Sequence, residues 1–202
     1  SIYNLASLYS NLGRYSEAEP LYKKSLAIKE KALGPEHPNV APSLGNLGLL
    51  YHNQDRYAEA EPLYIRSLTI NEKAFGPEHT SVAIILSNLA SLYSDLGRYS
   101  KAETLYKRSL KINEKAFGQD HPDLAATMGN LASLYETQGR YSEAEALYKK
   151  SLAIREKIHG PEHPDVAPSL NNLGILYHDQ DRYAEAEPLY IRSLTINEKA
   201  FG

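Results

Sequence analysis

The sequence contains no cysteine, which excludes disulfide bonds and metal sites built from thiolates. It also lacks any apolar run close to the ~20 residues that span a bilayer, and no basic and then apolar leader follows Ser1. Neither sign of charge dominates, because 22 Lys and Arg residues are interspersed with 25 Asp and Glu residues and the net charge is −3. Such a balance offers no electrostatic footprint for nucleic acid or an anionic membrane. We therefore expect a soluble, cytoplasmic protein with no nucleic-acid and no membrane partner.

The motifs of common enzyme classes are missing as well. There is no glycine-rich phosphate loop, no nucleophile elbow and no His-Glu-x-x-His motif. Of the seven histidines, four occupy equivalent positions of a repeated segment: His37, His79, His121 and His163. Stacked helical repeats lie ~10 Å apart, so these four side chains cannot converge on one ion. We expect no enzymatic activity, no catalytic residue, no metal site and no cofactor, and we assign the four histidines to capping of helix N-termini or to solvent.

What the sequence does contain is one segment that recurs every 42 residues, with Pro35–Gly76 as its clearest copy. The register is marked by a Gly-Arg-Tyr or Asp-Arg-Tyr triplet that starts at residues 13, 55, 97, 139 and 181. A fixed period of about 20 to 50 residues is typical of a stacked repeat array. We therefore expect a single array over residues 1–202. Its first repeat, 1–34, lacks its opening residues, and four full repeats follow: 35–76, 77–118, 119–160 and 161–202.

Each repeat is expected to form two helices. The first begins at a histidine that proline usually follows, and it ends at the Gly or Asp of the triplet, because glycine adopts the left-handed conformation without strain and aspartate adopts it at a cost of about 1 kcal/mol. Its apolar stripe in the clearest copy is Val40, Leu44, Leu47, Gly48 and Tyr51. The resulting fold would be an all-α α-solenoid, a right-handed superhelix of ten helices in about five tandem hairpins.

The second helix of each repeat would end at the glycine that closes the repeat. In three repeats it would begin with a capping box, in which serine and glutamate satisfy the first backbone N–H groups: Ser16-x-x-Glu19, Ser100-x-x-Glu103 and Ser142-x-x-Glu145. Its buried stripe in the clearest copy would consist of Ala60, Leu63, Tyr64, Ser67, Leu68 and Ala74.

These residues resemble a known family. The order Leu47-Gly48-x-x-Tyr51, followed by Ala60-x-x-x-Tyr64-x-x-Ser67-Leu68, resembles the tetratricopeptide repeat. The 42-residue period, with Gly-x-x-His-Pro and Asn-Asn-Leu, is most similar to the kinesin light chain subclass. The resemblance covers the whole chain, and it implies a protein–protein interaction scaffold that binds an extended peptide segment of a partner in a concave groove.

An asparagine recurs in every first helix, on a face away from the apolar stripe. Asparagine is less favourable than alanine in a helix by about 0.5–0.7 kcal/mol, and its amide offers donors and an acceptor to one peptide unit. In the family that this chain resembles, that face lines the groove, and such an asparagine holds the backbone of a bound peptide. The alternative is that the asparagines tie adjacent helices together or remain from recent duplication. The predicted groove residues are Asn4, Ser7, Asn11, Asn46, Leu49, His52, Asn53, Asn88, Ser91, Asp95, Asn130, Ser133, Thr137, Asn172, Ile175, His178 and Asp179.

The predicted groove face also carries Ser10, Ser94 and Glu136, and it has no lysine or arginine. A preference for acidic cargo, which a basic groove would provide, is therefore not expected. Recognition through the peptide backbone and small pockets is expected instead. Fifteen of the sixteen tyrosines fall in three columns, which we assign to packing rather than to a binding platform.

A second class of function is a structural spacer or a self-associating module without a groove ligand. Repeat arrays normally finish with a polar-faced capping repeat. The last segment instead carries Leu189, Tyr190, Leu194 and Ile196, which interior repeats would bury. Head-to-tail association would cover such ends, as would further repeats if the sequence is an excerpt from a longer array.

Overall fold

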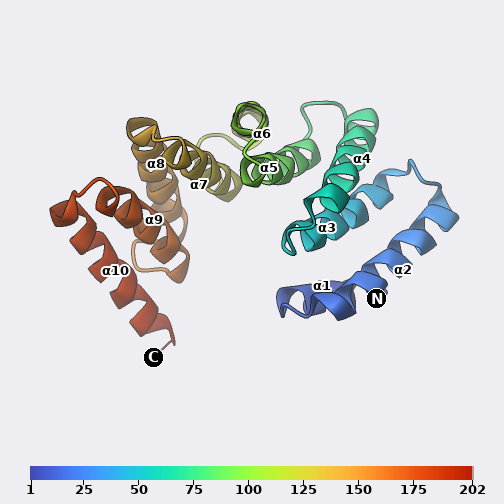
Figure 1. Cartoon of the computed structure of the whole chain (residues 1–202), viewed down its shortest axis with the longest axis horizontal. Coiled ribbons are helices and arrows are strands. Elements are labelled where there is room, and N and C mark those ends of the chain that lie inside the picture. The colour runs from blue at the N-terminus through green and yellow to red at the C-terminus, as the bar shows by residue number, and fades with distance from the viewer. Residues whose placement is uncertain (202) are drawn as a thin grey trace. The chain divides into compact units, whose positions relative to one another are not determined.

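The structure is a computed structural model that describes residues 1–201, without the side chain of Phe201. Over these residues it contains α-helices and two short 3₁₀ turns but no strand, so the all-α solenoid of ten helices is confirmed (Figure 1). The elements are α1 (Ile2–Asn11), α2 (Tyr15–Leu33), η1 (Pro38–Val40), α3 (Ala41–His52), α4 (Tyr57–Phe75), α5 (Thr80–Asp95), α6 (Tyr99–Phe117), α7 (Pro122–Thr137), α8 (Tyr141–His159), η2 (Pro164–Val166), α9 (Ala167–His178) and α10 (Tyr183–Phe201). None of the described helices is both long enough and apolar enough to cross a membrane.

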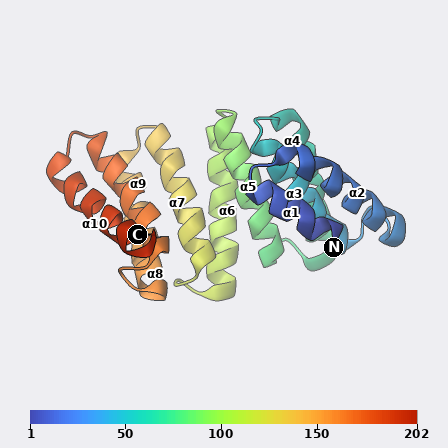
Figure 2. The same cartoon turned by 90° about the horizontal axis from the view of Figure 1, so that it is seen from below.

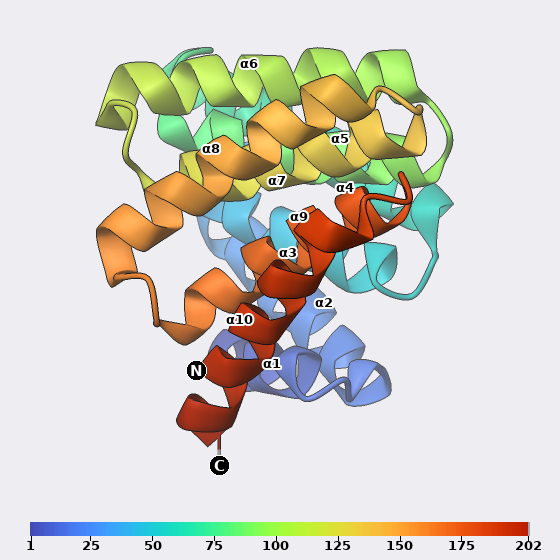
Figure 3. The same ribbon diagram turned by 90° about the vertical axis from the view of Figure 1, so that its left-hand side faces the viewer.

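The chain divides into two compact units, Ser1–Leu105 and Tyr106–Gly202, and the border lies within α6. In the first unit α1 packs on α2 and α3 packs on α4, and α5 then follows against α4. In the second unit α7 packs on α8 and α9 packs on α10, as two views of the chain show (Figures 2 and 3). These four packed helix pairs each come from one predicted repeat.

The predicted apolar stripe of the first helices forms the core. The side chains of Val40 in η1 and of Leu44, Leu47 and Tyr51 in α3 are buried. Gly48 faces the Tyr64 ring of α4 so closely that an added Cβ would lie 3.0 Å from it. In α4, Ala60, Tyr64 and Ser67 are buried as predicted. The expectation for Ala74 is wrong, since it is exposed while Ile70 and Asn71, on the adjoining part of the helix surface, are buried.

The helix ends follow the sequence signals in most places. Asp55 and Asp181 adopt φ values of 58° and 59°, where other repeats have glycine at 69–71°. The four equivalent histidines cap the following helical turn, because each ring Nδ1 accepts a hydrogen bond of 3.1–3.3 Å from the backbone N–H two residues later. Their predicted capping role is confirmed.

The predicted capping boxes are wrong. Helix α2 begins at Tyr15, so Ser16 already lies inside its first turn, and the N-cap is Arg14, whose side chain makes no capping bond. The helix starts before Ser16 because the preceding turn is closed by a backbone hydrogen bond, in which the Arg14 N–H donates to the Tyr9 oxygen at 2.8 Å. Helices α6 and α8 begin in the same register, at Tyr99 and Tyr141, so the other two boxes fail in the same way.

Two glutamates of those boxes, Glu19 and Glu145, instead join neighbouring repeats, and so does Glu61 at the equivalent position. Glu19 of α2 accepts hydrogen bonds from Arg56 at 2.6 Å and from the Tyr51 hydroxyl at 3.1 Å, both in the next repeat. We call this arrangement the Glu–Tyr–Arg clamp. Two further clamps have equivalent contacts: Glu61 with Tyr93 and Arg98, and Glu145 with Tyr177 and Arg182. Hydrogen bonds from Arg56 and Arg182 lower the pKa of Glu19 and Glu145 to about 2.

Candidate functional site

The recurring asparagines lie on the first helix of each pair, as predicted. Asn4, Asn130 and Asn172 are exposed, and Asn46 and Asn88 are half-buried. The Asn46 Nδ2 donates to the Tyr3 hydroxyl, so this asparagine ties α3 to α1 as the structural alternative requires. Within residues 1–201 the side chains of the other four have no hydrogen-bond partner.

In the first unit, a pocket of about 330 Å³ lies between Asn46 and Asn88. Its apolar lining includes Pro42, Ile84 and Ile85. Ile84 is 55 % exposed and Ile85 is buried, so the pocket has an apolar wall and an apolar floor. Such a pocket suits an apolar side chain whose neighbouring peptide units reach the two carboxamides.

His52 and Asp95, two predicted groove residues, bind each other. The His52 Nε2 lies 2.6 Å from the Asp95 Oδ2, and the His52 side chain is only 10 % exposed. Its ring also meets the edges of Tyr57 and Tyr64, with ring centroids 5.7 and 6.3 Å apart. His52 therefore links α3 to α5, and the half-exposed Asp95 carboxylate is the more accessible of the two.

In the second unit, a pocket of about 440 Å³ brings together five of the predicted groove residues. They are Ser133 and Thr137 of α7, Asn172 and Ile175 of α9, and Asp179. Glu136, Tyr141 and Tyr148 complete the lining. Sequence reasoning did not predict that the two tyrosines line a pocket, because it assigned all three tyrosine columns to packing.

Glu136 gives this second pocket an acidic character. Its Oε2 accepts a hydrogen bond of 2.8 Å from the buried Tyr148 hydroxyl, and its Oε1 is buried without a partner among the described residues. Burial raises the pKa of Glu136 and the Asp179 carboxylate raises it further, against the lowering effect of the Tyr148 bond. No lysine or arginine lines the pocket. A cationic group placed there would be attracted to the carboxylates of both Glu136 and Asp179.

The remaining predicted groove residues occupy the same helices or the turns after them. Leu49 and Ile175 are equivalent positions of α3 and α9, 39 % and 40 % exposed. His178 lies next to Asp179 in the chain, with 3.4 Å between its Nδ1 and the Asp179 Oδ1, and its ring meets the edge of Tyr183. The others lie at the surface or half-buried, in or directly after the first helices: Ser7, Asn11, Asn53 and Ser91.

Comparisons with known proteins identify the class of this repeat. The family model of the tetratricopeptide repeat matches residues 1–73, 43–115, 81–157 and 123–199. The chain therefore belongs to the tetratricopeptide repeat family, whose members are generally protein–protein interaction scaffolds without enzymatic activity. A search of curated proteins gives no match.

Solved structures confirm the similarity to kinesin light chains. BtubC (BKLC) from P. vanneervenii is 26 % identical with a TM-score of 0.83, over 100 % of this chain and 80 % of that one. A putative kinesin light chain of Podosopora anserina with nearly identical TPR-like repeats is 28 % identical with a TM-score of 0.78, over 99 % of this chain and 95 % of that one. A Rap protein complexed with Competence and Sporulation Factor has a TM-score of 0.84 over 98 % of this chain and 53 % of that one, and at 18 % identity it shares the fold alone.

Proposed function

We propose that this chain is a non-enzymatic scaffold that binds an extended segment of a partner protein along the asparagine-bearing face of its first helices. The observation that carries the proposal is that each unit has a pocket on this face, lined by members of the asparagine column. The general function of the family supports it. In this proposal residues 1–202 act as one array.

The spacing of the asparagines suits an extended ligand. Consecutive stacked helix pairs lie ~10 Å apart, and an extended chain advances about 3.3 Å per residue. The Asn46 Nδ2 is bonded to Tyr3, but its Oδ1 can still accept, so this oxygen and the Asn88 amide would contact ligand peptide units about three residues apart. The ligand side chain between these contacts would enter the apolar pocket of the first unit.

The two pockets also determine the chemistry of the preferred partner. The pocket of the first unit is apolar and suits an aliphatic or aromatic side chain. The pocket of the second unit has Glu136 and Asp179 and no cationic lining, so it suits lysine or arginine. We therefore expect a ligand segment with at least one basic residue and one apolar residue, rather than the acidic cargo that a basic groove would select.

Site-specific crosslinking tests where the ligand binds. Peptides selected from a random library against the whole chain are the probe, and a photoreactive amino acid replaces either Ile175 or Ile191. Ile175 lines the pocket of the second unit, whereas Ile191 is 56 % exposed on α10 outside that pocket. We expect the peptide to crosslink from Ile175 and not from Ile191. The reverse pattern, or a library without any binder, would contradict the proposal.

Self-association is the alternative function, and one surface favours it. Ile191 and Leu194 of α10 are both more than half exposed, whereas Leu152, the equivalent of Leu194 in α8, packs against the core of the second unit. Light scattering over a concentration series separates the two functions. The scaffold proposal expects a constant molecular mass, and a mass that rises with concentration would favour self-association.

A further inference from the structure

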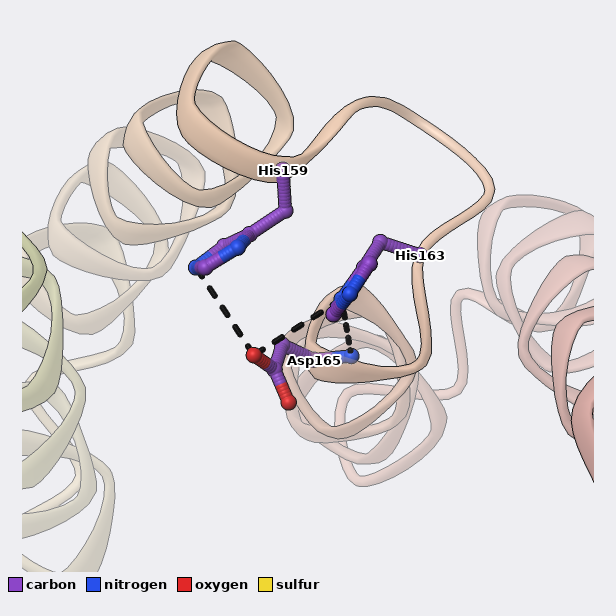
Figure 4. Close-up of side chains that lie close together, drawn as sticks. All are labelled: His159, His163 and Asp165. Atoms are coloured by element: carbon purple, nitrogen blue, oxygen red, sulfur yellow. Dashed lines mark hydrogen bonds and ion pairs between the residues drawn. The ribbon is translucent and has the colours of Figure 1, made fainter.

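A cluster of two histidines and one aspartate lies at the junction of α8 and α9, outside the proposed peptide-binding face. His159 ends α8, His163 lies in the following loop, and Asp165 is part of η2 (Figure 4). The Asp165 Oδ2 lies 3.7 Å from the His159 Nε2 and 3.6 Å from the His163 Nδ1. One ligand atom from each residue falls within 4.8 Å of the other two. All three side chains reach solvent, with exposures of 28 %, 44 % and 56 %.

The other junctions show how this cluster departs from the repeat pattern. Phe75 stacks on His79 and Phe117 stacks on His121, with ring centroids 4.8 and 3.9 Å apart. His159 replaces that phenylalanine and stacks on His163 at 4.8 Å, so the fold already has room for either ring. This substitution adds a second metal-binding nitrogen beside a histidine and an aspartate that already lie together.

We propose that His159, His163 and Asp165 form a binding site for a divalent transition metal of the Zn²⁺ class. Imidazole nitrogen with one carboxylate oxygen is a ligand set that such ions accept, and water would complete a tetrahedral shell. Tetrahedral bonds of about 2.0–2.1 Å place ligand atoms about 3.3 Å apart. The ligand atoms are now 3.6 to 4.8 Å apart, so they must move closer together to bind one ion, and exposed side chains can do this by rotating.

Two neighbouring contacts would weaken the binding of a metal ion at this site. The His163 Nδ1 accepts the 3.2 Å capping bond from the Asp165 N–H, and a metal ion on that nitrogen would displace this bond. The Arg155 Nη1 donates to the backbone oxygen of Asp165 at 3.4 Å, which places a positive charge nearby. We therefore expect a reversible site of modest affinity rather than one needed for folding.

Titration calorimetry with Zn²⁺ in a buffer that does not bind metal tests this site on the whole chain. We expect one saturable site per chain, and affinity at least about tenfold weaker in the His159→Phe variant. This variant restores the ring that stands at residues 75 and 117, so its circular dichroism and metal-free thermal stability should match the original. Equal Zn²⁺ binding by His159→Phe would overturn the proposal, because the remaining six histidines would then account for it. Absence of saturable binding by the original chain would overturn it as well.

The junction of α6 and α7 allows a gain-of-function test. Phe117, His121 and Asp123 repeat the geometry without the second histidine, and the His121 Nδ1 lies 3.8 Å from the Asp123 Oδ2. The Phe117→His variant should bind two Zn²⁺ ions per chain. A folded variant that still binds only one would contradict the claim that these three ligands suffice.

Discussion

Replacing Glu136 with glutamine is expected to weaken binding of a basic peptide by about 10- to 100-fold without destabilising the fold. A hydrogen bond between charged partners contributes about 1.5–3 kcal/mol, which corresponds to this range of affinity. Glutamine keeps an oxygen that can accept from the Tyr148 hydroxyl, so the packing of α7 on α8 is retained. The loss should therefore appear in binding alone.

Glu136→Gln should lower peptide affinity, but it should not lower the stability of the fold. Because burial raises the pKa of Glu136 in the folded state, its contribution to stability is present in acid and is lost as the pH rises through that pKa. At neutral pH the glutamine variant should be as stable as the original or more stable. Isothermal titration of a selected peptide and urea unfolding measure the two effects. A matched Glu187→Gln variant alters the net charge equally on α10, and equal loss of affinity in both variants would contradict a specific pocket.

Replacing Glu145 with glutamine is expected to lower the free energy of unfolding by about 1–2 kcal/mol at neutral pH. Glu145 accepts from Arg182 at 2.7 Å and from the Tyr177 hydroxyl at 3.0 Å, so its charge joins α8 to the last helix pair. A pKa lowered from 4.5 to about 2 corresponds to about 3 kcal/mol. Solvent screening reduces this figure, because the Glu145 side chain is 21 % exposed.

The clamp also predicts how stability depends on pH. A carboxyl group with a lowered folded-state pKa contributes stability above its unfolded pKa, and that stability is lost as the pH falls through the folded value. The difference between the original and Glu145→Gln should therefore disappear between about pH 4.5 and pH 2. Urea unfolding over this range measures it. Glu187 holds the same column position but has no ion pair among residues 1–201, so Glu187→Gln should show no such loss.

The fold could be predicted almost completely because each part of it has a local signal that is repeated. The stripe of α3 and the left-handed Asp55 follow from spacing and backbone sterics alone. The capping boxes failed because the start of α2 depends on a backbone bond from Arg14 to Tyr9, which the serine pattern does not report. The partners of Glu19 could not be predicted either, since they come from another repeat.

Part of the lining of the second-unit pocket could be predicted from the sequence, but the acidic character of that pocket could not. The column containing Asn172 predicts one side of this pocket, whereas its acidic character depends on Glu136 of one repeat lying near Asp179 of the next. The proposed metal site at His159 was not predicted, because only histidines at equivalent positions were compared with one another. The signal was present in the sequence, since phenylalanine stands at residues 75 and 117 where the fourth junction has histidine.

The central claim is that the asparagine column binds a ligand rather than holds helices together. The most direct test replaces Asn88, Asn130 and Asn172 with alanine and measures peptide affinity and unfolding free energy on the same samples. Asn46→Ala serves as the contrast, because it removes the bond to Tyr3. We predict that the triple variant loses peptide binding while its stability is unchanged or slightly raised, since alanine favours helix. A stability loss above about 2 kcal/mol with binding retained would contradict the account, because buried structural hydrogen bonds would then be the function of these residues.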